Sequence, residues 1–243
     1  MDKRLLMTRL RSLLFMLWLY GSMAFFGIGC SPFLLLPRRA AMLPIRWWAH
    51  TVLFGARWIT GIRVEFRGLE HRPEGAALLA GKHLSMLDTI APFTVLNHPA
   101  FVLKQELMYL PFLGWFAART KMVPVRRDDA AKALKGMVAA CRDRLAEGRQ
   151  ILIFPEGTRS NPGDDPDYKP GVAALYRDLE VPCHLLATNS GQFWPGHGID
   201  RRPGTVVFEF LPPLPAGLKR AEFMAQVKDR LETASAALIA EQS

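Results

Sequence analysis

The feature that most constrains the fold of this chain is an alternation of short apolar runs with longer segments of helical periodicity. Seven runs have the length and composition of strands: Arg63–Phe66, Ala76–Ala80, Phe101–Leu103, Met122–Val125, Ile151–Phe154, His184–Ala187 and Thr205–Leu211. Asp129–Glu147 and Lys219–Ala240 instead repeat apolar residues at the spacing of a helix. We therefore expect an α/β fold with a mostly parallel central sheet of about seven strands, flanked by helices.

Positive charge is concentrated at the N-terminus of the chain. The formal net charge is +9, and residues 1–60 contain eight basic side chains and one acidic side chain. These charges bracket Leu13–Leu36, an uncharged segment of 24 residues that is long enough to cross a bilayer. A nucleic-acid-binding protein usually carries its basic stripe on the folded domain. The pattern therefore favours an anionic membrane surface and argues against nucleic acid as a partner.

Three structures compete for this N-terminal segment: a cleaved signal peptide, a single transmembrane helix and a monotopic hairpin. The apolar run continues well past Ser22-Met23-Ala24, the one plausible cleavage site. Pro32 and Pro37 would end a helix that begins near Leu5. The next segment, Ala40–Ile62, is amphipathic and contains three tryptophans, as interfacial helices do. We favour the hairpin and divide the chain into an N-terminal membrane-anchoring helical segment, 1–62, and a folded domain, 63–243.

A histidine and an aspartate follow the second predicted strand with a defined spacing. His83 and Asp88 would lie about 140° apart on one continuous helix and could not meet. Ser85 and Asp88 have the spacing of a capping box, so a helix that begins after Ser85 would leave His83 outside it. Helical side chains lean toward the N-terminus, and Asp88 could then reach back to His83. The carboxylate would hold one ring nitrogen and leave the other as a base, but a simple cap is an alternative reading.

A second motif follows the strand Ile151–Phe154 and reads Pro155-Glu156-Gly157-Thr158-Arg159-Ser160. Gly157 permits a tight turn, and Arg159 can bind a phosphate through its fork of donors. A turn at the carboxyl end of a parallel strand is where α/β folds place their ligands. An ordinary turn with a solvated arginine is the alternative. The charged pair Glu156 and Arg159, directly after four apolar residues, favours a binding role.

Together the two motifs, His83-x4-Asp88 and Phe154–Ser160, resemble the glycerolipid acyltransferase family, and within it the bacterial 1-acylglycerol-3-phosphate O-acyltransferases (lysophosphatidic acid acyltransferases). The resemblance covers roughly residues 60–215. A third family block reads Met122–Arg127, in which Arg127 falls on the family arginine and Arg126 replaces the usual acid. A fourth block, Val181–Gly191, lacks the second proline of the family pattern, and no roles are assigned within it.

The resemblance implies an enzyme that transfers a fatty acyl group from acyl-CoA or acyl-carrier protein to the sn-2 hydroxyl of 1-acylglycerol-3-phosphate (lysophosphatidic acid), which gives phosphatidic acid. His83 would be the base and Asp88 would orient it. The candidate substrate-binding residues are Arg127, Arg126, Glu156, Gly157, Thr158 and Arg159. Main-chain N–H groups near Gly157 are candidates for an oxyanion site. No metal and no cofactor beyond the acyl donor is implied.

The same resemblance places the protein at the bacterial inner (cytoplasmic) membrane, with the catalytic domain facing the cytoplasm. The three cysteines, Cys30, Cys141 and Cys183, form no CxxC pair and no disulfide pattern, which fits a reducing compartment. Three alternatives stay open. They are the same chemistry on a lyso-ornithine lipid or lysophosphatidylglycerol, a hydrolase in which the histidine activates water, and a non-catalytic membrane-anchored lipid-binding protein.

Overall fold

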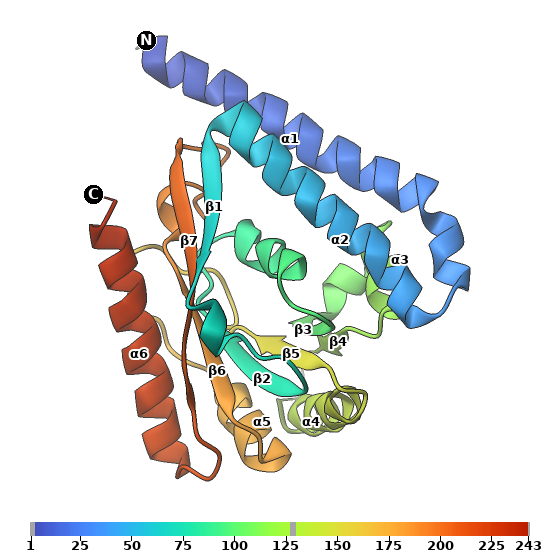
Figure 1. Ribbon diagram of the computed structural model, residues 1–243, viewed down its shortest axis with the longest axis vertical. Helices are drawn as coiled ribbons and strands as arrows, with labels where there is room; N and C mark the ends of the chain where they lie inside the picture. The colour runs from blue at the N-terminus through green and yellow to red at the C-terminus, as the bar shows by residue number, and fades with distance from the viewer. Residues whose placement is uncertain (1–2, 127–129, 243) are drawn as a thin grey trace.

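A single seven-stranded sheet forms the centre of the protein, as seen in the computed structural model, which describes residues 3–126 and 130–242 (Figure 1). The strand order is β1-β7-β6-β2-β5-β3-β4. The strands are β1 (Ile62–Arg67), β2 (Ala77–Gly81), β3 (Pro99–Lys104), β4 (Val123–Val125), β5 (Gln150–Ile153), β6 (Cys183–Thr188) and β7 (Gly204–Leu214). Each predicted apolar run overlaps one of them.

All neighbouring strands are parallel except β6 and β7, which pair antiparallel. The prediction of a mostly parallel sheet with about seven strands is therefore confirmed. The central strands are buried on both faces, as in other sheets covered by helices. In β2, for example, Leu79 belongs to the apolar core on one face, while Leu78 and Ala80 belong to the core on the other.

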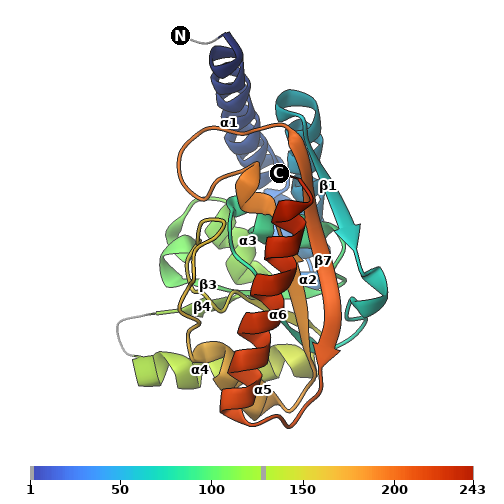
Figure 2. The same cartoon turned by 90° about the vertical axis from the view of Figure 1, so that its left-hand side faces the viewer.

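Helices cover both faces of the sheet. On one face lie α4 (Ala130–Ala146), α5 (Gly171–Leu179) and α6 (Arg220–Ala240). The predicted apolar side of α4, with Met137, Val138 and Cys141, is buried there. On the other face lie α1 (Lys3–Gly29), α2 (Arg38–Gly55) and the short α3 (Leu113–Arg119). Figure 2 shows α6 in front of the sheet and α1 and α2 behind it. The sequence did not predict α3 and α5, which have only seven and nine residues.

The N-terminal helices α1 and α2 form an antiparallel hairpin (Figure 1). The first helix ends at Gly29, just before Pro32, and a 3-10 turn leads to Pro37, the N-cap residue of α2. The indole of Trp18 donates a 2.9 Å hydrogen bond to the Thr51 carbonyl. After α2, a π-helix at Ala56–Thr60 leads into β1. The predicted two-helix arrangement is therefore present.

The hairpin has two different sides. Phe15 and Leu19 of α1 are buried in the same core as Leu79 of the central sheet. Most of the exposed large hydrophobic side chains of the described protein also lie on the hairpin, among them Leu17 and Phe25. The segment Leu5–Gly29 is long and apolar enough to cross a membrane, with a mean hydropathy of 1.6. Insertion of this hairpin into a bilayer, and the boundary between 1–62 and 63–243, stay predictions.

Candidate active site

Five neighbouring strands end at one edge of the sheet. Because β6, β2, β5, β3 and β4 are mutually parallel, their carboxyl ends lie together, and open α/β sheets bind ligands at such an edge. His83 follows β2, Phe154 follows β5, Ser190 follows β6 and Arg126 follows β4. The topology therefore brings four parts of the chain that are distant in sequence to one place.

His83 and Asp88 meet as the spacing predicted. The Nδ1 atom of His83 lies 3.2 Å from Oδ2 of Asp88. Ser85 is the N-cap of a short 3-10 helix, Met86–Thr89, and forms a complete capping box with Asp88. His83 precedes this helix, so the carboxylate in its first turn can reach back to the imidazole. The capping box and the histidine contact coexist, and the two readings of Asp88 do not exclude each other.

The Asp88 carboxylate is buried and held on both oxygens. Its side chain is 1% exposed. Oδ2 accepts 2.7 Å hydrogen bonds from the main-chain N–H groups of Leu84 and Ser85, in addition to its contact with His83. Oδ1 accepts a 2.5 Å hydrogen bond from the hydroxyl of Ser190. A buried carboxylate needs such donors, and here they also fix the direction in which it faces the histidine ring.

The His83 ring is oriented so that one nitrogen is left for chemistry. Nδ1 faces Asp88, which assigns the proton to Nδ1 and leaves the lone pair on Nε2. Within the described residues Nε2 has no hydrogen-bond partner in the protein. The ring stacks on Phe154 with centroids 4.2 Å apart and planes at 21°, and the His83 side chain is 14% exposed. The imidazole is therefore held in one orientation and is still accessible.

The second motif folds as a tight turn beside the histidine. The N–H of Gly157 donates a 3.0 Å hydrogen bond to the Phe154 carbonyl, and Gly157 has a φ of 67°, which favours glycine. The turn therefore uses the Gly157 N–H, which had been a candidate for the oxyanion site. Thr158 and Arg159 follow the turn and are exposed to solvent.

Glu156 connects the two motifs. Its side chain is only 1% exposed, and its Oε1 accepts a 2.8 Å hydrogen bond from the main-chain N–H of His83. Its Oε2 accepts a hydrogen bond from the hydroxyl of Ser160. The N–H of Ser160 in turn donates a 3.0 Å hydrogen bond to the His83 carbonyl. The contacts that the structure shows for Glu156 are within the protein, so its role as a substrate-binding residue stays a prediction.

A buried lysine accompanies Glu156. The Nζ atom of Lys82 lies 3.5 Å from Glu156 Oε1 and 2.7 Å from Oε1 of Glu232 on α6. The hydroxyl of Tyr168 also donates a 2.9 Å hydrogen bond to Glu232. Burial raises the pKa of Glu156, and the charge of Lys82 opposes that rise. Helix α6 is thereby linked through Lys82 to the turn that holds His83.

The arginines proposed for phosphate binding lie at the same edge, with one exception that the structure does not describe. Arg126 directly follows β4 and is exposed, as is Arg159 after β5. Arg127 lies outside the described residues. Exposed guanidinium groups at the edge of the sheet that carries the His–Asp pair suit an anionic group that approaches from solvent or from a membrane surface.

Sequence reasoning did not assign roles to several residues that support the site. Ser190 lies in the fourth family block, Lys82 precedes His83 directly, and Tyr168 lies in the polar segment between β5 and α5. Two of their contacts join residues 102 and 150 positions apart. Local patterns contain no information on such pairs. The only sequence signals available were a buried-type residue in a polar loop and a basic residue after an apolar strand.

The thiols and carboxylates suggest no other reactive centre in the described part of the chain. Cys141 and Cys183 are free and buried, and burial raises the pKa of each thiol to about 12. They are therefore poor nucleophiles. Among the described residues, no cluster of three histidine, cysteine or carboxylate side chains is suited to hold a metal ion.

Comparison with known proteins gives the site a family. The model of the acyltransferase family matches residues 63–189, which contain both motifs. The chain belongs to the acyltransferase family. It is 32% identical to the 1-acyl-sn-glycerol-3-phosphate acyltransferase of Pseudomonas aeruginosa over 88% of this chain and 82% of that protein. It is also 28% identical to the alpha form of the same enzyme from Ovis aries, over 69% of this chain and 60% of that one.

The fold of this acyltransferase is also known from an experimental structure. The crystal structure of the 1-acyl-sn-glycerophosphate (LPA) acyltransferase PlsC from Thermotoga maritima resembles it with a TM-score of 0.78. The likeness covers 95% of this chain and 97% of the other, at 20% sequence identity. The α/β architecture and the N-terminal helices of the acyltransferase therefore have a counterpart in that structure.

Proposed function

We propose that this acyltransferase moves a fatty acyl group from a thioester donor, acyl-CoA or acyl-carrier protein, to the sn-2 hydroxyl of 1-acylglycerol-3-phosphate, which makes phosphatidic acid. The observation that carries the proposal is the buried, fully hydrogen-bonded Asp88 beside an accessible His83 ring. The names of the Pseudomonas aeruginosa and Ovis aries relatives support the choice of acceptor.

The geometry suits direct attack by the lipid hydroxyl. Nε2 of His83 accepts the hydroxyl proton as the oxygen attacks the thioester carbonyl, and the resulting imidazolium faces Asp88 through Nδ1. When the tetrahedral intermediate collapses, the carbon–sulfur bond breaks, and the proton on Nε2 passes to the leaving thiolate. No side-chain nucleophile is needed, in agreement with the buried, weakly acidic thiols of Cys141 and Cys183.

Recognition of the acceptor is assigned to the rim of the site. Arg159 and Arg126 supply charge for the phosphate of the lysolipid, with Arg127 as a third candidate. Thr158 adds a hydroxyl beside Arg159. The membrane is the source of the acceptor, and the exposed apolar side of the α1–α2 hairpin supports docking to it. We place the enzyme at the inner membrane with the catalytic domain in the cytoplasm, where the soluble donor is available.

One assay tests this function. The purified protein is supplied with radiolabelled acyl-CoA and 1-acylglycerol-3-phosphate in detergent, and the products are separated by chromatography. We expect labelled phosphatidic acid from the wild type and none above background from His83→Ala. His71→Ala is the matched control, because His71 follows β1 at the opposite edge of the sheet. It should keep full activity.

Other products would assign another function. Labelled free fatty acid without acceptor would indicate a hydrolase. Acylation of lysophosphatidylglycerol or a lyso-ornithine lipid alone would keep the mechanism and replace the acceptor. Binding without turnover would support a lipid-binding protein. Acyl transfer that survives in His83→Ala would contradict the assignment of the base. A parallel assay with acyl-carrier protein identifies the donor by the ratio of the two kcat/KM values.

A further inference from the structure

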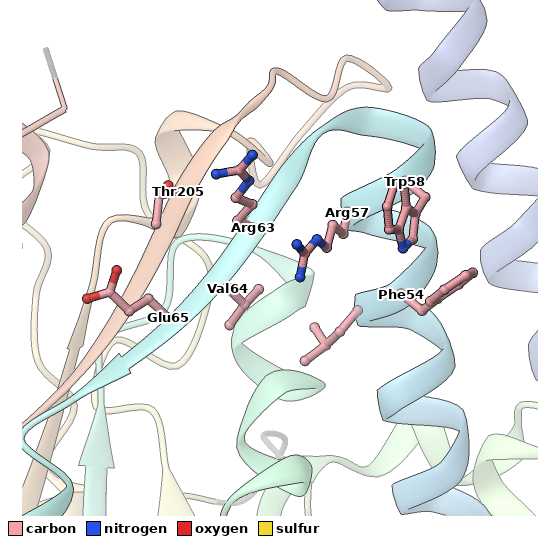
Figure 3. Close-up of a pocket in the computed structure, with 8 residues that line it drawn as sticks. Phe54, Arg57, Trp58, Arg63, Val64, Glu65 and Thr205 are labelled. Atoms are coloured by element: carbon pink, nitrogen blue, oxygen red, sulfur yellow. The ribbon is translucent and has the colours of Figure 1, made fainter.

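A groove lies in the elbow between the end of α2 and the edge strand β1, away from the His83 site (Figure 3). It has a volume of about 520 Å³. Apolar and aromatic side chains of α2 and the π-helix form one wall, including Phe54 and Trp58, and β1 contributes Arg63 to the other. Figure 3 shows Arg57 extending from the helix toward β1, while Phe54 lies on the side facing α1.

Both guanidinium groups that line this groove, those of Arg57 and Arg63, lack an acidic partner among the described residues. The carboxylate of Glu65, which also lines the groove, is paired with Arg67 at 2.7 Å. Arg67 is itself shared with Glu241 at 2.8 Å. Among the described residues, no carboxylate lies within ion-pair distance of Arg57 or Arg63, so the groove carries uncompensated positive charge that suits an anion.

An aromatic row connects the groove to the exposed side of the hairpin. The rings of Trp18 and Phe54 have centroids 6.2 Å apart, as do those of Phe54 and Trp58. Phe54 and Trp58 are 57% and 65% exposed. Exposed aromatic rings beside arginines are typical of the interface between headgroups and acyl chains. The guanidinium groups and the apolar row therefore fit the two halves of one amphipathic ligand.

The groove and the catalytic site open at the same edge of the sheet. Because β6 and β7 are antiparallel and β1 is parallel to β7, the start of β1 lies at the edge where β2 ends. Strands β7 and β6 separate β1 from β2. A membrane surface that delivers lipid to His83 would therefore also meet Arg57 and Arg63, at a place distinct from the reaction.

We infer that this groove binds the headgroup of an anionic phospholipid of the surrounding bilayer that does not react. Its phosphate contacts Arg57, Arg63 on the other side of the edge strand β1 adds positive charge nearby, and its acyl chains follow Phe54 and Trp58 toward α1 (Figure 3). The occupant is a membrane lipid and not free phosphate, because only a lipid uses both the charged and the apolar wall. This inference goes beyond the proposed acyl transfer, since it concerns how the enzyme is held at the membrane.

The test compares two double variants with the same change in net charge. Arg57→Gln/Arg63→Gln removes the charge of the groove, and Arg39→Gln/Arg46→Gln removes two arginines of α2 outside it. Binding is measured by co-sedimentation with vesicles of phosphatidylcholine alone and with vesicles containing an equal part of phosphatidylglycerol. Short-chain phosphatidylglycerol below its micelle concentration is titrated by the fluorescence of the tryptophans, in the wild type and in both variants.

We expect the groove variant to lose about tenfold or more of its affinity for phosphatidylglycerol vesicles, and its saturable titration, while the control keeps most of both. Equal losses in the two variants would mean diffuse attraction and overturn the proposal, as would no loss in the groove variant. Displacement of the short-chain lipid by an equal concentration of inorganic phosphate would overturn the lipid as occupant. A raised KM for the acceptor in detergent, in the groove variant only, would place the groove within the acceptor site and also overturn it. Equal unfolding temperatures establish that both variants fold.

Discussion

The main-chain N–H of His83 donates a 2.8 Å hydrogen bond to the buried carboxylate of Glu156. A second hydrogen bond runs from the N–H of Ser160 to the carbonyl of His83. The turn therefore holds both the N–H and the C=O of the histidine main chain. The ring of His83, the proposed base, is thereby positioned twice, by Asp88 at its Nδ1 atom and by the Phe154–Ser160 turn at the backbone of the residue. The two sequence motifs therefore act together to fix the position of His83.

If Glu156 acts by positioning His83, then the effect of a substitution should depend on whether a hydrogen-bond acceptor remains. Glu156→Gln keeps an oxygen for the His83 N–H, and we expect kcat within about tenfold of the wild type. Glu156→Ala removes the acceptor, and we expect kcat to fall about a hundredfold with KM for the acceptor lipid little changed. Steady-state kinetics with both substrates measure this. A large rise in KM in both variants would instead indicate that Glu156 contacts the substrate directly.

The ion pair between Lys82 and Glu156 should matter for stability, because both side chains are buried, at 3% and 1% exposed. Lys82→Met leaves Glu156 without that partner, and we expect a loss of about 3–5 kcal/mol in the free energy of unfolding near neutral pH. Lys228→Met is the control, since its pair with Asp165 is exposed and should contribute under about 1 kcal/mol. Urea unfolding measures both, and equal effects would contradict the prediction.

The same variant should respond to pH in a defined direction. Burial raises the pKa of Glu156, and removal of Lys82 raises it further. A carboxyl group whose pKa is higher in the folded than in the unfolded protein adds to the free energy of unfolding at pH values below its unfolded pKa. This contribution is lost as the pH rises through its folded pKa. The stability deficit of Lys82→Met relative to the wild type should therefore be small in acid and grow toward neutral pH. A deficit that grows toward acid pH would contradict this sign.

Ser190 should support catalysis through Asp88. In Ser190→Ala the carboxylate loses a 2.5 Å charge-assisted hydrogen bond inside the protein, and such bonds contribute about 1.5–3 kcal/mol. We expect kcat to fall about tenfold with KM unchanged. Ser12→Ala is the matched control, because Ser12 is equally buried but its hydroxyl bonds to the main chain of Arg201 and Thr8 and not to Asp88. A kcat unaffected in Ser190→Ala, or reduced equally in both variants, would show that this hydroxyl does not assist Asp88.

Arg159 should affect the acceptor more than the chemistry. Arg159→Gln removes a donor proposed for the phosphate, and we expect KM for 1-acylglycerol-3-phosphate to rise about tenfold or more, with a smaller change in kcat. Arg177→Gln, an exposed arginine on α5, is the control for net charge. An uncharged monoacylglycerol used as acceptor should show the same KM in Arg159→Gln as in the wild type. Equal effects on both acceptors would remove Arg159 from the phosphate site.

A membrane should protect Cys30 from water-soluble reagents if the α1–α2 hairpin inserts into it. Cys30 lies between α1 and the turn that leads to α2 and is partly exposed, whereas Cys141 and Cys183 are buried. We expect a water-soluble thiol reagent to label Cys30 in the vesicle-free protein and to label it much more slowly once vesicles are added. Cys30→Ser should remove the rapid labelling. Unchanged labelling on vesicles would mean that this end of the hairpin stays in water.

The elements predicted correctly are those whose own residues contain the pattern. The apolar face of α4 and the runs that became β2 and β5 could be recognised locally, because periodicity reports burial within one segment. Helix α5, Gly171–Leu179, is too short for such a pattern to be recognised, and the sequence did not predict it. Arg127, carried over with the third family block, stays a prediction because it lies outside the described residues.

The amino-acid sequence by itself determined the local parts of the site. Ser85 as a cap places His83 before a helix and turns Asp88 back toward it, since a capping box depends on residues within four positions. Only the tertiary structure decided what surrounds that pair. Ser190 reaches Asp88, and Glu232 reaches Lys82, because the strand order brings the ends of β6 and β2 side by side and packs α6 against them. Strand order depends on packing across the whole chain, which no local pattern records.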